Sequence, residues 1–165
     1  MELYRITPTG LESVYSKLFP HAIIVLLKYR PRETPNQDNL ILVTAAHQLI
    51  IFRLSGSELQ VILNESVEDR LGRLASFGGC GAVSPDHRRL YLHLYNHSIK
   101  VVALPQAATD PALPPPPTNV RIDTQRVVAL HALAFGTTPL LAIVAEDKTN
   151  TRRVSFATLA PDDTT

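Results

Sequence analysis

The chain has 165 residues, of which 45% are hydrophobic and 19% charged, a composition typical of a globular fold and not of general disorder. A formal net charge of +1 predicts no general attraction to nucleic acid or to an anionic membrane surface. The longest purely apolar run, residues 22–27, is too short to span a bilayer, and the N-terminus lacks the pattern of a secretory leader. A single cysteine, Cys80, excludes an internal disulfide. We therefore expect a soluble intracellular protein.

In chain order, the first elements are two short strands, residues 3–6 and 14–18, on either side of the Thr9-Gly10 pair. Glycine after threonine between two such runs is typical of a hairpin turn. We expect residues 1–20 to form the last hairpin of a preceding, incomplete unit. Residues 11–18 are also the one weak candidate for a helix.

A β-rich hairpin follows three times. Its first strand begins at Leu40, Leu90 and Leu140, a spacing of about 50 residues that is typical of the blades of a β-propeller. The strand pairs are residues 40–44 with 49–52, 90–95 with 99–102, and 140–144 with 154–157.

Each hairpin also follows an apolar run suited to the innermost strand of a blade: residues 22–27, 80–83 and 127–133. Residues 59–63 and 119–122 are candidates for outer strands, which gives four strands per unit. The predicted fold is all-β, an incomplete β-propeller of about two and a half four-stranded blades. Its units are 1–20, 21–66, 79–125 and an incomplete 126–160. The alternative is an ordinary β-sandwich, which does not require the unit to repeat.

Residues 105–117 form a proline-rich segment with six prolines, four of them consecutive at 114–117. Proline has no N–H to donate to a sheet, so we expect an exposed loop between a third and a fourth strand. A polyproline ligand is the alternative. Residues 31–35, with a proline at each end, are predicted to form the turn between an inner strand and its hairpin.

Catalytic and metal-binding patterns are weak. His93 and His97 have a zinc-binding spacing only on a helix, whereas here one lies in a predicted strand and the other in a turn. The glycines around Cys80 precede a strand and lack the lysine of a phosphate loop, so we expect a tight entry into that strand and a buried thiol. We predict no enzyme, no metal and no cofactor. The alternative is a hydrolase that uses His93 or His97.

The segment with the sequence EDRLGR, residues 68–73, links an outer strand to the next inner strand and should lie on a rim of the ring. Arginine at a rim suits the capture of carboxylates or carbonyl groups on a partner protein. The alternative is that Asp69 pairs with Arg70 or Arg73 only to stiffen the loop.

This segment and its surroundings resemble a known family, the large subunits of damaged-DNA-binding protein, which are adaptors of cullin-4-type ubiquitin ligases. The similarity to the first of their propellers covers nearly the whole chain, and the D-R-x-G-R loop is its most specific part. It extends over residues 3–4, 9–11, 29–31, 68–73, 76–78, 84–86, 89–95, 99–102, 104–105 and 119–121. The proline-rich loop is longer than this family pattern leads us to expect.

The resemblance implies a scaffold that recruits substrate-receptor proteins for ubiquitination and DNA repair, in the nucleus, with the cytoplasm as an alternative location. It implies that Arg70, Arg73 and Arg121 contact those partners. It implies no direct binding of the cullin by this segment, and we expect no direct binding of nucleic acid or membrane. The alternative is a fragment of a splicing-factor 3b or cleavage-and-polyadenylation large subunit, in RNA processing. Whether the chain is a fragment, an isoform or a decayed copy is left open by these residues.

Overall fold

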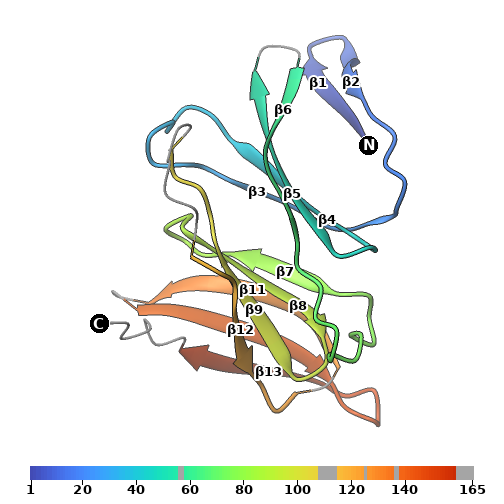
Figure 1. The fold of residues 1–165 in the computed structure, drawn as a ribbon, viewed down its shortest axis with the longest axis vertical. Coiled ribbons are helices and arrows are strands. Elements are labelled where there is room, and N and C mark those ends of the chain that lie inside the picture. Colours follow the sequence, from blue (N-terminus) through green and yellow to red (C-terminus); the bar gives the residue numbers. More distant parts are fainter. Residues whose placement is uncertain (56–57, 108–114, 125, 136–137, 159–165) are drawn as a thin grey trace.

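The computed structural model describes residues 1–55, 58–107, 115–124, 126–135 and 138–158, and Figure 1 shows their arrangement. These residues form thirteen β-strands in four antiparallel sheets. Across these ranges there is no helix, and hence none long and apolar enough to cross a membrane.

The first sheet is a two-stranded hairpin, β1 (Glu2–Thr7) and β2 (Gly10–Ser16), with Thr7 opposite Gly10 at its tip. Gly10 has a φ of 139°, a left-handed conformation that favours glycine at this turn. The weak helix candidate at residues 11–18 is wrong: most of it is β2, whose residues pair with β1.

Two complete four-stranded sheets follow. The strand order of the first is β3-β4-β5-β6, and that of the second is β10-β9-β8-β7. Their strands are β3 (Ile23–Tyr29), β4 (Asn39–Thr44), β5 (Gln48–Ser55), β6 (Glu58–Ser66), β7 (Cys80–Val83), β8 (Arg89–Tyr95), β9 (Ser98–Ala103) and β10 (Thr118–Arg121).

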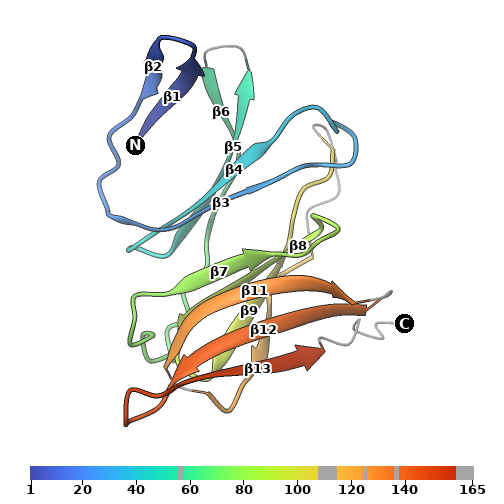
Figure 2. The ribbon, with the colours of Figure 1, turned by 180° about the vertical axis from the view of Figure 1, so that it is seen from behind.

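The last sheet has three strands, β11 (Val127–Phe135), β12 (Thr138–Glu146) and β13 (Arg152–Thr158), in the order β11-β12-β13. All three predicted hairpins are present, as β4–β5, β8–β9 and β12–β13. The predicted fold class, an all-β incomplete propeller, is confirmed. The sandwich alternative is wrong, because four sheets follow one another in series (Figure 2). The exact limits proposed for the units stay predictions.

The core lies between consecutive sheets, which pack face to face. Between β3–β6 and β7–β10, the side chains of Ile41, Ile51 and Leu92 are completely buried. Between β7–β10 and β11–β13, the buried cluster includes Ile99 and Leu141. Each of these strands alternates its side chains between two faces, so the second sheet contributes to both clusters. At about 25 cal/mol per Å² of apolar surface, this burial is the main force that holds the sheets together.

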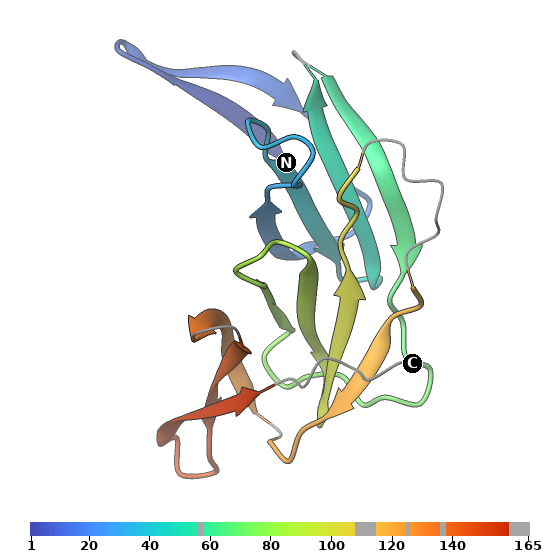
Figure 3. The same ribbon diagram turned by 90° about the vertical axis from the view of Figure 1, so that its left-hand side faces the viewer.

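The proline-rich segment connects β9 to β10, between a third and a fourth strand as predicted (Figure 3). The backbone carbonyl of Pro105 accepts a hydrogen bond of 3.0 Å from the hydroxyl of Tyr29, and Pro115 and Pro116 are exposed. Pro114 lies outside the described residues, and the polyproline-ligand alternative stays a prediction. Residues 31–35 lie between β3 and β4, where a turn was expected.

Candidate protein-binding rim

Strand register brings the predicted loops to one rim of the stacked sheets. At the end of β6, Ser66 is opposite Gln48, which follows the β4–β5 turn. At the end of β10, Arg121 is opposite Ser98, which follows the β8–β9 turn. Because antiparallel partners share one end of a sheet, the segment 67–79 and the β10–β11 connection lie beside these hairpin turns. We call this side the hairpin-turn rim; it comprises the turns β4–β5, β8–β9 and β12–β13 and the connections β6–β7 and β10–β11.

The segment 67–79 is fixed to the sheets by main-chain hydrogen bonds. The Val67 N–H donates to the carbonyl of His47 at 2.8 Å, in the β4–β5 turn of the preceding sheet. Farther along, the Ala75 N–H donates to the Leu94 carbonyl at 2.9 Å, and the Arg73 carbonyl accepts from the Asn96 N–H at 2.8 Å. Both ends of the EDRLGR sequence are therefore anchored, one on the β4–β5 turn and the other on the end of β8 and the β8–β9 turn.

The side chain of Tyr95 contacts both the segment 67–79 and the β4–β5 turn. Its hydroxyl accepts from the Asp69 N–H at 2.9 Å and lies 2.7 Å from Nδ1 of His47. Its ring packs edge-on against the His47 ring, with centroids 5.1 Å apart. Only 4% of Tyr95 is exposed, and burial raises the pKa of its phenol, so the hydroxyl stays a neutral hydrogen-bonding group. One side chain thus joins two sheets and the loop between them.

Gly72 is required where the loop crosses Tyr95. A Cβ atom at this position would lie 2.6 Å from Cδ1 and 2.8 Å from Cγ of the tyrosine ring. Any larger residue would have to push the loop off the ring, so the glycine of the D-R-x-G-R pattern has a steric explanation here. The alternative role predicted for Asp69 is wrong among these residues: its Oδ1 accepts from the Leu71 N–H at 3.1 Å, and it forms no ion pair with Arg70 or Arg73.

All three arginines predicted from the sequence lie on this rim and are exposed. Arg70 and Arg73 belong to the anchored loop, and Arg121 ends β10. None of the three forms an ion pair with any residue that the structure describes. Their guanidinium groups are therefore open to a partner, although their role in binding stays a prediction.

Sequence reasoning missed the apolar side chains of the same loop. Leu71 is 97% exposed, Leu74 62% and Phe77 43%. Arg126, from the β10–β11 connection, lies over the Phe77 ring with its guanidinium carbon 5.2 Å from the ring centroid. The sequence shows a leucine directly after Arg70 and after Arg73, but it does not show that these leucines are exposed.

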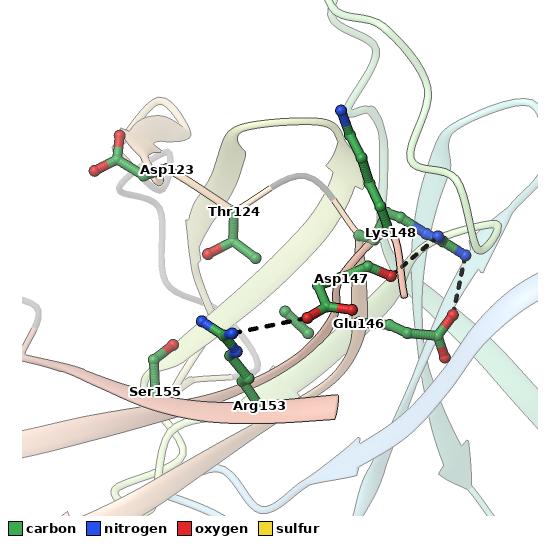
Figure 4. Close-up of a pocket in the computed structure, with 9 residues that line it drawn as sticks. Asp123, Thr124, Glu146, Asp147, Lys148, Arg153 and Ser155 are labelled. Carbon is green, nitrogen blue, oxygen red and sulfur yellow. Dashed lines mark hydrogen bonds and ion pairs between the residues drawn. The ribbon is translucent and has the colours of Figure 1, made fainter. Parts of the chain in front are cut away.

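A pocket of about 360 Å³ lies farther along the rim, at the β12–β13 turn (Figure 4). Arg126 donates to the carboxylate of Glu146 at 2.9 Å and to the carbonyl of Asp147 at 3.3 Å. Arg153 pairs with Asp147 at 3.8 Å. Opposite charges thus face one another inside the pocket, so a ligand there would experience little net electrostatic field.

The histidine and cysteine candidates lie around one strand pair, in which Cys80 of β7 is opposite His93 of β8. His93 is completely buried, its Nδ1–H donates to the Ser98 carbonyl at 3.0 Å, and burial lowers its pKa. His97 lies in the β8–β9 turn with a φ of 62°. Burial raises the pKa of the Cys80 thiol to about 11, so the reactive thiolate is disfavoured. Within the part of the chain that the structure describes, no three histidine, cysteine or carboxylate side chains are grouped to hold a metal ion.

Gly78 and Gly79 form the predicted tight entry into β7. Their φ angles are 77° and 98°, and a Cβ on Gly79 would lie 3.0 Å from the Leu94 side chain.

A family model described as the RSE1/DDB1/CPSF1 first beta-propeller matches residues 1–163. The chain belongs to this family. The resemblance inferred from the rim loop and the strand repeats is confirmed, and so is the assignment to a first propeller. The family description itself joins three kinds of protein and does not separate them.

Curated relatives have the name DNA damage-binding protein 1. The rice protein (Oryza sativa subsp. japonica) is 26% identical over 165 residues, which cover 99% of this chain and 15% of the relative. Relatives 1b and 1a of Arabidopsis thaliana are each 26% identical over 156 residues, covering 93% of this chain and 14% of the relative. The chain thus spans about one seventh of the length of these relatives.

Proposed function

We propose that this chain is a protein-binding scaffold module of a cullin-4-type ubiquitin ligase adaptor, and that its hairpin-turn rim holds substrate-receptor proteins. The observation that supports this most is the state of Arg70, Arg73 and Arg121. All three are exposed, none forms an ion pair with a described residue, and their rim is held by hydrogen bonds to the neighbouring sheets and hairpin turns. Because the backbone of the rim is already fixed, a partner has to order only the arginine side chains when it binds through carboxylate or carbonyl groups.

The apolar part of the rim supports a protein partner over a small ligand. Leu71 and Leu74 alternate with the arginines, and an interface needs such apolar anchors beside its polar contacts. Fixed loops also allow the partner to bind without first ordering the surface. The nearby pocket, in contrast, is internally neutralised and adds no obvious small-molecule site.

The proposal extends to the cellular role. We place the protein in ubiquitination and DNA repair, in the nucleus with the cytoplasm as an alternative location, and with no catalytic activity of its own. The segment would not bind a cullin directly. With a net charge of +1, it would not bind nucleic acid directly either.

The test is calorimetric titration of the 165-residue chain with a purified substrate receptor of a cullin-4 ligase. Combined reversal of Arg70, Arg73 and Arg121 to glutamate should weaken binding at least tenfold, because attraction becomes repulsion. The matched control is Arg32→Glu, since Arg32 is an exposed arginine in the β3–β4 loop, on the opposite rim. Equal affinities for the reversed rim and the wild type would refute the role of these arginines, and no binding by the wild type would refute the proposed function.

A second candidate is a scaffold module in RNA processing, which the family description favours because it includes RSE1 and CPSF1 beside DDB1. Affinity purification of the tagged chain from nuclear extract distinguishes the two. Recovery of cullin-4 substrate receptors supports the first proposal. Recovery of splicing-factor 3b or cleavage-and-polyadenylation subunits in their place supports the second.

A further inference from the structure

Two serines of the chain lie in a sequence pattern that arginine-directed protein kinases recognise. Arg73 stands three residues before Ser76, Arg152 stands three residues before Ser155, and a phenylalanine follows each serine directly. Kinases of this class bind such an arginine through their own carboxylates and hold an apolar residue after the acceptor. Both serines are therefore candidate phosphorylation sites by sequence, and the structure distinguishes them.

The Ser76 pattern is presented on the surface of the hairpin-turn rim. Ser76 and Arg73 are exposed, and Phe77 is 43% exposed. Arg73 forms no ion pair with a described residue, so its guanidinium group is open to the carboxylates of a kinase. All three groups that a kinase of this class contacts are thus accessible together.

The backbone around Ser76 is held at its base and not along its length. Leu74 forms an isolated antiparallel bridge with Tyr95, so the residues that lead to Ser76 are extended. Ser76 and Phe77 lie in a turn, and neither makes a main-chain hydrogen bond with a described residue. Residues 73–77 also lie outside every strand of the four sheets. A kinase that binds them therefore does not have to separate any strand pair.

Ser155 lies in a different environment. It belongs to β13 and is opposite Ile143 of β12 in a continuous antiparallel register. The arginine of its pattern, Arg152, is already paired with Glu146 at 3.5 Å. A kinase would have to detach β13 from β12 and compete with this ion pair. The fold therefore favours Ser76 over Ser155, although the two sequence patterns are alike.

We propose that Ser76 accepts a phosphoryl group from ATP, transferred by an arginine-directed serine kinase. The bond between the γ-phosphorus of ATP and the oxygen that bridges it to the β-phosphorus breaks, and a bond from that phosphorus to Ser76 Oγ forms. The hydroxyl proton passes to a carboxylate of the kinase, and ADP leaves. The product carries about two negative charges on the loop of Arg70 and Arg73, and it offsets their free positive charge. The acceptor role of Ser76 does not depend on the proposed function.

The test is phosphorylation of the folded 165-residue chain by the catalytic domain of calmodulin-dependent protein kinase II with Mg²⁺ and ATP. Mass spectrometry of the digested chain quantifies the phosphate at each serine. Arg73→Gln should lower kcat/KM at Ser76 at least about tenfold, because it removes the charged recognition contact, and Ser76→Ala should remove the signal at this site. The matched control is Arg32→Gln, an exposed arginine of the β3–β4 loop, which should keep the wild-type rate. Circular dichroism checks that each variant is folded.

Two synthetic peptides, residues 70–79 and 149–158, correct for the preference of the kinase for either sequence. Relative to the rate of its own peptide, Ser155 in the folded chain should react at least about tenfold more slowly than Ser76 does, since β13 must first open. The inference is overturned if the kinase leaves the peptide 70–79 unmodified. It is equally overturned if the peptide is modified and Ser76 of the folded chain is not.

The effect of this phosphate on partner binding rests on the proposed function. In calorimetric titration with a substrate receptor, kinase-treated wild type should bind at least about fivefold more weakly than kinase-treated Ser76→Ala, because the added charge repels acidic groups of the receptor. Equal affinities would show that the phosphate does not regulate the rim. Absence of binding by both proteins would refute the proposed function, and the kinase assay would still decide whether Ser76 is an acceptor.

Discussion

Strands β9 and β13 are the third strands of consecutive sheets, and their sequences predict much the same environment. Next to its turn, β9 alternates polar and apolar residues over residues 98–101, and β13 does so over residues 153–156. Yet Ile99 and Val102 of β9 are 0% and 2% exposed, whereas Val154 and Phe156 of β13 are 59% and 61% exposed. The difference lies outside the strands: β9 has β10 beside it and a sheet on each face, whereas β13 ends its sheet. The adjacent strands and packed sheets therefore determine whether these side chains are buried, and the sequence pattern of a single strand does not specify them.

Two loops of the hairpin-turn rim, the segment 67–79 and the β12–β13 turn, also differ in how much they depend on other segments. The segment 67–79 is held by groups of two other segments, Tyr95 and His47. The β12–β13 turn satisfies its own polar groups, since Asp147 Oδ1 accepts from the N–H groups of Thr149 at 2.8 Å and Thr151 at 3.0 Å. A hydrogen bond of 2.6 Å from the Thr149 hydroxyl, together with these two backbone bonds, lowers the pKa of the Asp147 carboxyl. The β12–β13 turn thus adds local bonds to the contacts of Arg126 with Glu146 and Asp147, whereas the segment 67–79 depends mainly on its neighbours.

The largest expected difference comes from the same substitution in both strands. Val102→Ala removes buried methyl groups between two sheets and should lower the free energy of unfolding by about 2 kcal/mol. Val154→Ala removes exposed ones and should change it by less than about 0.5 kcal/mol. Urea unfolding measures both changes in the free energy of unfolding. Equal losses would contradict the exposure of Val154.

A smaller effect is expected from the crowded glycine of the rim. Gly72→Ala would place a Cβ atom 2.6 Å from the Tyr95 ring and should cost about 1.5 kcal/mol as the loop moves away. Limited trypsin digestion reports that movement, because a detached loop is cleaved faster after Arg70 and Arg73. Cleavage after Arg153, in β13, should keep its wild-type rate and is the internal control. Unchanged cleavage at all three sites would show that the loop accommodates the methyl group.

The sequence alone was enough to predict the strands, because alternation and turn residues are local signals. The three hairpins at about 50-residue spacing are all present, and the repeat distinguished a propeller from a sandwich. The same kind of signal correctly placed the glycine entry into β7. At Leu11 and its neighbours local reasoning was ambiguous, and pairing with β1 decided for a strand.

The contacts that build the candidate site were out of reach of the sequence. Tyr95 meets His47, 48 residues earlier in the chain, through the packing of two sheets. That contact fixes the EDRLGR loop, and nothing in the residues beside Tyr95 indicates it. The rim on which the arginines gather likewise follows from the register of β6 and β10, which the sequence left undefined.

The smallest expected effect is on the pH dependence of stability, and it comes from the buried side chain of His93. It is completely buried in β8 of the middle sheet, with Nε2 unpartnered among the described residues, whereas His131 of the last sheet is exposed. Burial lowers the pKa of His93 below the ordinary 6.5, the nearby His97 lowers it further, and the bond to the Ser98 carbonyl opposes the shift. Just below pH 6.5, the His93 imidazole is therefore protonated in the unfolded chain but still neutral in the folded chain.

The contribution of His93 to the free energy of unfolding is therefore fully present above pH 6.5 and is lost as the pH falls below it. The slope from this one group is at most about 1.4 kcal/mol per pH unit. His93→Gln does not titrate, and its amide is still able to donate to Ser98, so the slope between pH 6.5 and 5.5 should become shallower. His131→Gln should retain the wild-type slope, because His93 is intact. Urea unfolding across this pH range measures all three proteins. If His93→Gln kept the wild-type slope, the proton would bind elsewhere, and the burial of His93 would not govern the acid stability of the middle sheet.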